Sequence, residues 1–165
     1  MSSLKNLSIL GAGQAAVYAA SEFRKHDQNS IVTIFGDENY LPYERPPLSK
    51  DFLLNKKKED EFLFFSKKYF EDQNINFINE KIETVDFKNR SLLSNDNNKF
   101  SYDKLLITTG STNRKLTIDR EIDNKIFYLR NLEEAKKIKD RASKVSKIAI
   151  IGGGFIGLEI ASSLN

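Results

Sequence analysis

Residues 7–20, LSILGAGQAAVYAA, decide how this chain folds. An apolar run ends at Leu10, and glycines follow at positions 11 and 13 with small residues behind them. This is the G-x-G-x-x-G/A arrangement that joins a parallel strand to a helix. Gly11 allows the tight turn, Gly13 lets a pyrophosphate approach the backbone, and Ala16 lets the helix lie close to the strand. The N-terminus of that helix would offer free N–H groups and partial positive charge to an anion.

The next segments complete a β-α-β unit. The predicted helix carries Ala16, Val17, Ala20 and Phe23 on one face, and Glu22, Arg24 and Lys25 lie elsewhere on it. His26, the single histidine, falls at its end and is predicted to be exposed rather than catalytic. Residues 31–35, IVTIF, predict the second parallel strand. Asp37 or Glu38 then stands near the place of the acidic residue that binds ribose hydroxyls, although a plain polar turn is the alternative.

A stiff loop follows, YLPYERPPLSK at 40–50, which holds all three prolines of the chain. Proline fixes φ and biases the preceding residue to extended geometry. The loop carries Arg45 and Lys50, with Lys50 expected early in a short helix opened by the two adjacent prolines. Two cations on a stiff loop near a pyrophosphate turn favour ligand positioning over a rigid surface connection.

The middle of the chain predicts further elements between the two ends. A helix begins in or after the aromatic stretch 62–70, and Asn131 caps a charged helix. The remaining expected elements are strands at 74–78, 82–87, 91–93, 100–102, 104–109 (buried) and 126–128, and the capped helix at 132–144. The strands between 82 and 102 form a small antiparallel group that interrupts the parallel sheet.

A second glycine motif closes the chain. KIAII at 147–151 predicts a strand and runs into GGGFIGLE at 152–159, a full G-x-G-x-x-G that opens a helix. Two ordered copies imply two bound dinucleotides. The fold class is therefore α/β: a Rossmann-like dinucleotide-binding unit over 1–112 with an inserted antiparallel group, then the truncated start of a second Rossmann-like dinucleotide-binding unit over 113–165. The chain ends soon after the motif, so we expect an N-terminal fragment of a longer protein.

Composition narrows the function classes. The 165 residues hold 26 basic and 23 acidic side chains, a net charge of +3 that is too balanced to indicate nucleic-acid binding. Apolar runs are too short for a membrane span, and no signal-peptide pattern is present. The chain has no cysteine, which excludes disulfides, thiolate metal sites and cysteine redox catalysis within these residues and fits a cytoplasmic protein. We find no metal site and no nucleophile of a hydrolase.

Four segments together resemble the FAD-dependent NAD(P)H:ferredoxin reductases of bacterial oxygenase systems: PYERPPLSK at 42–50, TTG at 108–110, YLR at 128–130 and IGGGFIGLE at 151–159. The resemblance covers essentially the whole chain. It implies hydride transfer from NAD(P)H to flavin N5, followed by single electrons to a [2Fe–2S] ferredoxin. The alternatives are an FAD-bearing redox-signalling protein of the apoptosis-inducing-factor type, or an inactive nucleotide-binding fragment.

The resemblance also assigns residues to cofactors. The first motif would bind FAD and the second NAD(P)H. The positions implied for FAD are Gly11, Gly13, Gln14, Ala15, Asp37 or Glu38, Arg45, Lys50, Ile82 (through its backbone), Thr109, Gly110 and Arg130. The positions implied for NAD(P)H are Gly152, Gly154 and Gly157. Two departures from the pattern are Thr108, where relatives carry alanine, and the segment 111–114, which lacks their proline.

Lys50 and Glu159 are the predicted catalytic residues. The resemblance implies that both stand beside flavin N5 as an ion pair. The residues agree with that role, since Lys50 ends the stiff loop and Glu159 lies in the first turn of the helix that opens the nicotinamide site. Two unrelated surface charges are the alternative. A pair about 4 Å apart attracts by roughly 4 kcal/mol at an effective dielectric of about 20.

Overall fold

The computed structural model describes residues 5–117 and 125–165, which form two compact units. The first unit comprises Met1–Tyr43 with Leu63–Gly110, and the second comprises Glu44–Phe62 with Ser111–Asn165. The predicted cofactor domains, 1–112 and 113–165, stay a prediction.

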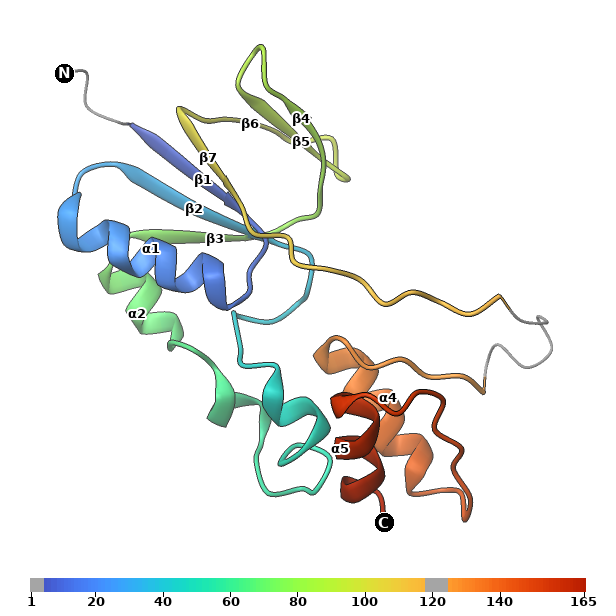
Figure 1. The fold of residues 1–165 in the computed structure, drawn as a ribbon. Helices are drawn as coiled ribbons and strands as arrows, with labels where there is room; N and C mark the ends of the chain where they lie inside the picture. Colours follow the sequence, from blue (N-terminus) through green and yellow to red (C-terminus); the bar gives the residue numbers. More distant parts are fainter. Residues whose placement is uncertain (1–4, 118–124) are drawn as a thin grey trace. The chain divides into compact units, whose positions relative to one another are not determined.

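A four-stranded parallel sheet forms the centre of the first unit (Figure 1). Its strands, in spatial order, are β3 (Ile75–Asn79), β2 (Ile31–Gly36), β1 (Asn6–Leu10) and β7 (Lys104–Ile107). Leu10 stands opposite Phe35 on one side and Ile107 on the other, so the three strands end at nearly the same level. The predicted β-α-β start and parallel sheet are confirmed.

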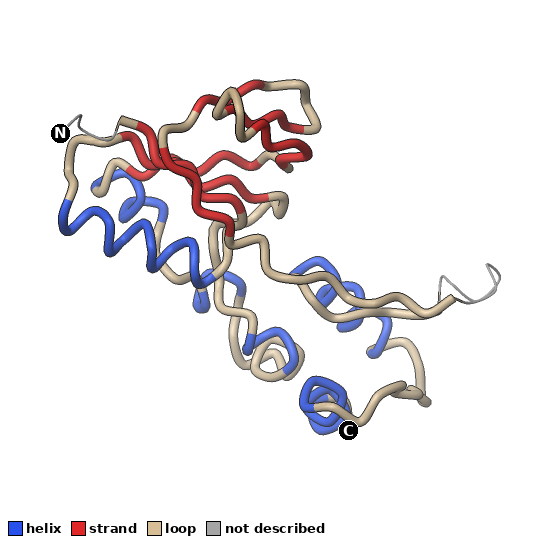
Figure 2. The backbone as a smooth tube through the Cα atoms, turned by 45° about the horizontal axis from the view of Figure 1, so that its top comes forward, coloured by secondary structure: helices blue, strands red, loops and turns tan. Residues whose placement is uncertain are grey.

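Helices α1 (Gln14–His26) and α2 (Lys67–Asp72) cover one face of this sheet (Figures 1 and 2). Alternate strand residues point to this face because side chains alternate along a strand. The buried cluster there consists of Ile9, Ala16, Val17, Ala20, Val32, Ile34, Phe70 and Ile75. The predicted apolar face of the first helix is confirmed.

The other face of the sheet packs against a three-stranded antiparallel sheet of β4 (Ile82–Asp86), β5 (Ser91–Ser94) and β6 (Lys99–Ser101). Leu10 and Phe35 lie in this second cluster with Leu92 and Tyr102. The Phe35 ring meets the Phe100 ring edge-on at 4.9 Å between centroids. The predicted antiparallel insertion is confirmed, and it explains why β1 and β2 are apolar on both faces.

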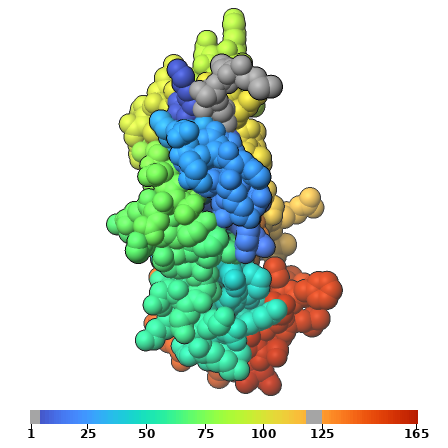
Figure 3. Space-filling view, turned by 90° about the vertical axis from the view of Figure 1, so that its left-hand side faces the viewer, coloured from blue at the N-terminus to red at the C-terminus, as the bar shows by residue number. Residues whose placement is uncertain are grey.

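An aromatic cluster joins α1 to the segment that leads into α2. The Tyr18 ring lies 5.8 Å from Phe64 and 6.3 Å from Phe65, and Phe65 stacks on Tyr69 at 4.0 Å. In Figure 3 the blue surface of α1 adjoins the green surface of this segment. The predicted helix near 62–70 begins at Lys67, because the side chain of Ser66 accepts the Tyr69 amide as an N-cap.

Arg24 contradicts the sequence prediction. We placed it off the apolar face of the first helix, yet it is 1% exposed. Its guanidinium donates to the carbonyl oxygens of Gln73 and Asn74, each at 2.7 Å, and of Asp27 at 3.0 Å. Burial lowers its pKa from the ordinary arginine value. Five donors let one arginine satisfy several carbonyls that the end of α2 leaves open, which outweighs the cost of burial.

The second unit is built from short helices. They are the 3₁₀ helices η1 (Pro46–Ser49) and η2 (Glu59–Phe62) and the α-helices α4 (Leu132–Ala142) and α5 (Phe155–Ser163). The side chain of Asn131 accepts the Glu134 amide and Glu134 reaches back to the Asn131 amide, so the predicted cap of α4 is confirmed as a capping box. Lys139 of α4 donates to the Phe52 carbonyl at 3.0 Å, which holds α4 against the segment after η1.

Three strand predictions need correction. The segments 126–128 and 147–151 are not strands, because no described strand pairs with either. The segment 104–109 was predicted to be buried, but β7 ends at Ile107, which is 53% exposed. Strand β7 is one of the two edge strands of the described four-stranded sheet, so one side of it has no neighbouring strand. Among the described residues, no helix combines the length and apolarity that a bilayer crossing needs.

Candidate functional site

The first glycine turn lies between β1 and α1. Gly11 has φ +96°, and its amide donates to the Phe35 carbonyl at 2.9 Å. A Cβ on Gly11 would lie 2.4 Å from the Thr108 carbonyl oxygen and 2.9 Å from the Thr109 Cα. Glycine is therefore required at position 11 for the positive φ and also because the end of β7 passes directly beside the turn.

The helix end beside Gly13 fits a pyrophosphate. Gly13 is the N-cap of α1; no side chain caps this end and no acidic residue occupies the first turn. A Cβ on Gly13 would meet no atom within 4 Å, whereas Ala16 is fully buried. Gln14 and Ala15 are exposed in the first turn. Their amides thus face open space with the positive end of the helix dipole behind them, the environment that an anion needs.

The end of β2 carries the two candidate ribose ligands. A Cβ on Gly36 would approach the Cβ of Ala12 to 2.8 Å, so the strand end packs closely on the glycine turn. Asp37 follows and is exposed, while Glu38 accepts a hydrogen bond from the hydroxyl of Tyr43. Both carboxylates lie at the carboxyl edge of the parallel sheet, and the assignment stays open between them.

The end of β7 reaches the same edge. The Thr108 hydroxyl donates to the Leu10 carbonyl at 2.9 Å and lies 3.2 Å from the Gly11 carbonyl. This threonine, a departure from the sequence pattern, therefore ties β7 to the glycine turn, which sequence reasoning missed. Thr109 and Gly110 follow it and are exposed, with Gly110 at φ +70°. The first unit thus brings the residues after β1, β2 and β7 to one edge, where open α/β sheets bind ligands.

Ile82 opens β4, and its side chain packs on the cluster beneath the antiparallel sheet. Only its backbone remains for the predicted contact with adenine.

The second unit brings Lys50 and Glu159 together, although the two are far apart in sequence. The Lys50 ammonium lies 3.1 Å from Glu159 Oε1. Lys50 is the C-cap of η1 and so ends the short helix, rather than standing early in it as the sequence predicted. The hydrogen bond from Ser49 and then the interaction with Lys50 lower the pKa of Glu159. The carboxylate is therefore ionised at neutral pH.

Arg45 and Arg130 also meet in the second unit. The Arg45 guanidinium donates to the Arg130 carbonyl at 2.5 Å, and both side chains are half-buried. The backbone amides of Arg130 and Asn131 donate to Glu134, which anchors this segment at the start of α4. The segment before η1 is thus tied to the segment before α4 through two residues that the resemblance assigns to FAD.

The second glycine turn leads into α5. Gly152 has φ +108°, and Gly154 is the N-cap of α5 with no side-chain cap. Cβ atoms on Gly152, Gly153 or Gly154 would meet nothing within 4 Å, which fits a second dinucleotide. Gly157 differs, because its Cβ would lie 2.3 Å from the Gly152 carbonyl oxygen. The absence of a side chain at Gly157 lets α5 pack directly against the Gly152 carbonyl. This role is separate from the predicted contact of Gly157 with the ligand.

Comparison with known proteins identifies the family. Residues 5–165 match the pyridine nucleotide-disulphide oxidoreductases. The chain belongs to this family.

Its relatives include reductases of small electron carriers. The chain is 34% identical over 94% of its length to the 3-phenylpropionate/cinnamic acid dioxygenase ferredoxin–NAD(+) reductase component of Photorhabdus laumondii, and 32% identical over 94% to the rubredoxin-NAD(+) reductase of Pseudomonas putida. The solved ferredoxin reductase for the CYP199A2 system of Rhodopseudomonas palustris superposes with a TM-score of 0.92 at 32% identity over 97% of this chain. The resemblance predicted from the sequence is confirmed.

The chain spans 39% of the first relative and 40% of each of the other two. Membership of a pyridine nucleotide-disulphide oxidoreductase family does not supply disulphide chemistry here, because the chain has no cysteine. The superposition on the solved ferredoxin reductase shows that this chain shares its α/β fold.

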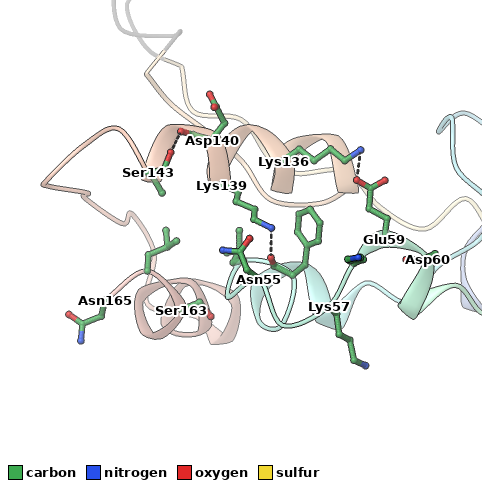
Figure 4. Close-up of a pocket in the computed structure, with 15 residues that line it drawn as sticks. Asn55, Lys57, Glu59, Asp60, Lys136, Lys139, Asp140, Ser143, Ser163 and Asn165 are labelled. Atoms are coloured by element: carbon green, nitrogen blue, oxygen red, sulfur yellow. Dashed lines mark hydrogen bonds and ion pairs between the residues drawn. The ribbon is translucent and has the colours of Figure 1, made fainter.

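A cavity of about 1200 Å³ lies in the second unit, between the segment after η1, α4 and the end of α5 (Figure 4). Charged side chains such as Lys57, Lys136 and Asp140 line much of it. None of the predicted site residues lines this cavity, so we assign it no part in cofactor binding. Within the described residues no cluster of three potential metal ligands occurs.

Proposed function

We propose that this protein is a flavoprotein reductase that passes electrons from NAD(P)H through FAD to a [2Fe–2S] ferredoxin of an oxygenase system. The open, uncapped N-terminus of α1 at Gly13, beside the carboxylates that follow β2, is the observation that carries the proposal. The second open turn at Gly154 supports a second dinucleotide. Relatives named as ferredoxin or rubredoxin reductases support the acceptor class.

The residues of the first unit fit the FAD pyrophosphate and ribose. The amides at Gly13, Gln14 and Ala15 would donate to the pyrophosphate, and Asp37 or Glu38 would accept from the ribose hydroxyls. Thr109, Gly110 and the Ile82 backbone would complete the FAD contacts of this unit. Two residues of the second unit are also assigned to FAD by the resemblance: Arg45 would neutralise phosphate charge, and Arg130 would line the FAD site. Gly152, Gly154 and Gly157 would hold NAD(P)H.

Bound FAD supplies the chemistry, because it accepts a hydride and releases electrons singly. The Lys50–Glu159 pair is proposed to act beside it. The Lys50 ammonium would supply positive charge where negative charge develops, and Glu159 would hold that ammonium in position. The 3.1 Å contact between the two side chains supports this role.

The acceptor is the finer part of the proposal. A [2Fe–2S] ferredoxin is what the family resemblance implies, while the name of the Pseudomonas putida relative makes rubredoxin the second candidate. We also propose a cytoplasmic location, since a reductase of this kind draws on the cytoplasmic NAD(P)H pool.

The test begins with the visible spectrum of the purified whole protein. We expect bound FAD, its anaerobic bleaching by NADH or NADPH, and cytochrome c reduction that depends on added [2Fe–2S] ferredoxin. Residues 1–165 alone should not reduce ferredoxin, because the segment 147–151 before the second turn pairs with no strand of the described chain. Colourless protein that gains no flavin on reconstitution would refute the proposal, and turnover only with rubredoxin would select the second acceptor.

The catalytic pair is tested by stopped-flow measurement of flavin reduction. Lys50→Met should slow hydride transfer with FAD still bound, Glu159→Gln should slow it less, and the double variant should be non-additive. Wild-type rates in both single variants would remove the pair from the reaction.

A further inference from the structure

Ser49 holds the carboxylate of Glu159 from the side opposite to Lys50. The Ser49 hydroxyl lies 2.5 Å from Glu159 Oε2, and the Lys50 ammonium lies 3.1 Å from Oε1. Two consecutive residues at the end of η1 therefore contact the two oxygens of one carboxylate. Of the described side chains, Lys50 supplies the ion pair to Glu159.

The serine hydroxyl has one proton and two acceptors within reach. The Pro46 carbonyl lies 3.4 Å from it, much farther than the carboxylate. Because a hydroxyl donates once and a carboxylate is the stronger acceptor, the proton goes to Glu159. Ser49 is 4% exposed, so water does not compete freely for this bond.

The serine is itself fixed by the helix that it contacts. The Ser163 hydroxyl donates to the Ser49 carbonyl at 2.7 Å. Glu159 and Ser163 are four residues apart on α5 and so share one face of that helix. The side chain of Ser49 thus holds Glu159, while its backbone is held by Ser163. The two hydrogen bonds therefore have different roles. The bond from the Ser49 hydroxyl positions Glu159, whereas the bond from the Ser163 hydroxyl only joins α5 to η1.

We propose that Ser49 is a positioning residue for the reaction, which holds Glu159 in the orientation that places its charge on Lys50. The inference rests on the proposed function, because it acts through the Lys50–Glu159 pair. Glu159 has a half-exposed lysine as its remaining partner when the hydroxyl is removed. The glutamate then loses its fixed rotamer, and the ammonium loses its fixed counter-charge. The lowered pKa of Glu159, for which the Ser49 bond is the leading cause, agrees with this arrangement.

The first measurement is the pKa of Glu159 in the whole FAD-loaded protein, by NMR of the ¹³C-labelled side-chain carboxyl. Ser49→Ala should raise it by about one unit, the size of one hydrogen bond to a charged group. Ser49→Thr keeps the hydroxyl and should restore most of the shift. Ser163→Ala is the matched control, because it removes a contact between the same segments and leaves Glu159 untouched. An unchanged pKa in Ser49→Ala overturns the proposal.

The second measurement is the pH profile of flavin reduction by NAD(P)H in stopped flow. The acid limb of the profile should move to higher pH in Ser49→Ala with FAD content unchanged. In Ser163→Ala it should stay at the wild-type pH. A shifted pKa with an unmoved profile overturns the role of Ser49 in the reaction but leaves the proposed function standing. Failure of NAD(P)H to reduce the wild-type flavin overturns the proposed function, and the role of Ser49 with it, whatever the NMR titration gives.

Discussion

The two glycine turns of this chain share a motif and differ in what supports them. Gly11 and Gly152 both have φ near +100°, and Gly13 and Gly154 both cap an open helix end. The first turn follows a paired strand and opens a helix with buried residues. The second follows a segment that is not a strand and opens a helix in which no residue is buried. The local geometry of the turn therefore forms from the motif itself, whereas its strand and helix packing depend on partners.

Gly13→Val against Gly154→Val gives the largest expected difference. Both positions have ordinary β-region dihedrals and open space, so neither change should cost more than about 1 kcal/mol of unfolding free energy in the cofactor-free protein. Gly13→Val should abolish FAD binding, because the side chain covers the amides that face the pyrophosphate. Gly154→Val should keep FAD and weaken NAD(P)H. Flavin absorbance and NAD(P)H titration measure the two effects, and normal flavin content in Gly13→Val would contradict the assignment of this turn.

Comparing Gly11→Ala with Gly152→Ala separates the cost of backbone strain at positive φ from the cost of a steric clash. Both carry the cost of a positive φ, about 1 to 2 kcal/mol. Gly11→Ala adds the collision with the Thr108 carbonyl, so we expect a total loss of about 3 to 5 kcal/mol in unfolding free energy from urea titration. Equal losses of unfolding free energy in the two variants would show that the end of β7 does not contact the first turn closely enough to exclude a Cβ at position 11.

Arg24→Met against Phe155→Ala compares the anchoring of the two helices. Removing the buried guanidinium leaves three carbonyls without a donor, so Arg24→Met should lower the unfolding free energy by about 3 kcal/mol. Phe155 is 88% exposed in α5, so Phe155→Ala should change it by less than about 0.5 kcal/mol. Chemical denaturation checks both, and a small loss for Arg24→Met would contradict its role at the end of α2.

The smallest expected effects are those of pH. Hydrogen bonds, first of all from the Ser30 hydroxyl, lower the pKa of Asp27 after α1, and the Ser49 hydroxyl leads in lowering that of Glu159 in α5. A lowered pKa in the folded state adds stability above the unfolded-state pKa, and the gain is lost as pH falls through the folded value. Both contacts should thus persist in mildly acidic solution and break only in stronger acid. Carboxyl titration by NMR tests this, and a midpoint above the ordinary carboxyl value for either residue would contradict it.

The secondary structure of the first unit was largely predictable because its signals are local. The glycine spacing and the apolar runs of this unit depend on residues close in sequence, and so does the Asn131 cap in the second unit. The failures at 126–128 and 147–151 have one cause: an apolar run predicts a strand, but hydrogen-bond pairing with another strand makes one. The prediction that Arg24 lies off the buried face of α1 was wrong for a related reason. Its burial is favourable only because its guanidinium reaches the backbone carbonyls after α2.

The sequence by itself determined the family, the two glycine turns and the residues expected to bind two dinucleotides, because those properties reside in short motifs with a fixed local geometry. Only the tertiary structure decided which atoms meet. It brought Thr108 onto the first turn, and it added the buried Ser49 hydroxyl to the carboxylate of Glu159, whose pairing with Lys50 the resemblance implies. Such contacts join residues about a hundred positions apart, and no local pattern specifies them because they depend on how distant segments pack.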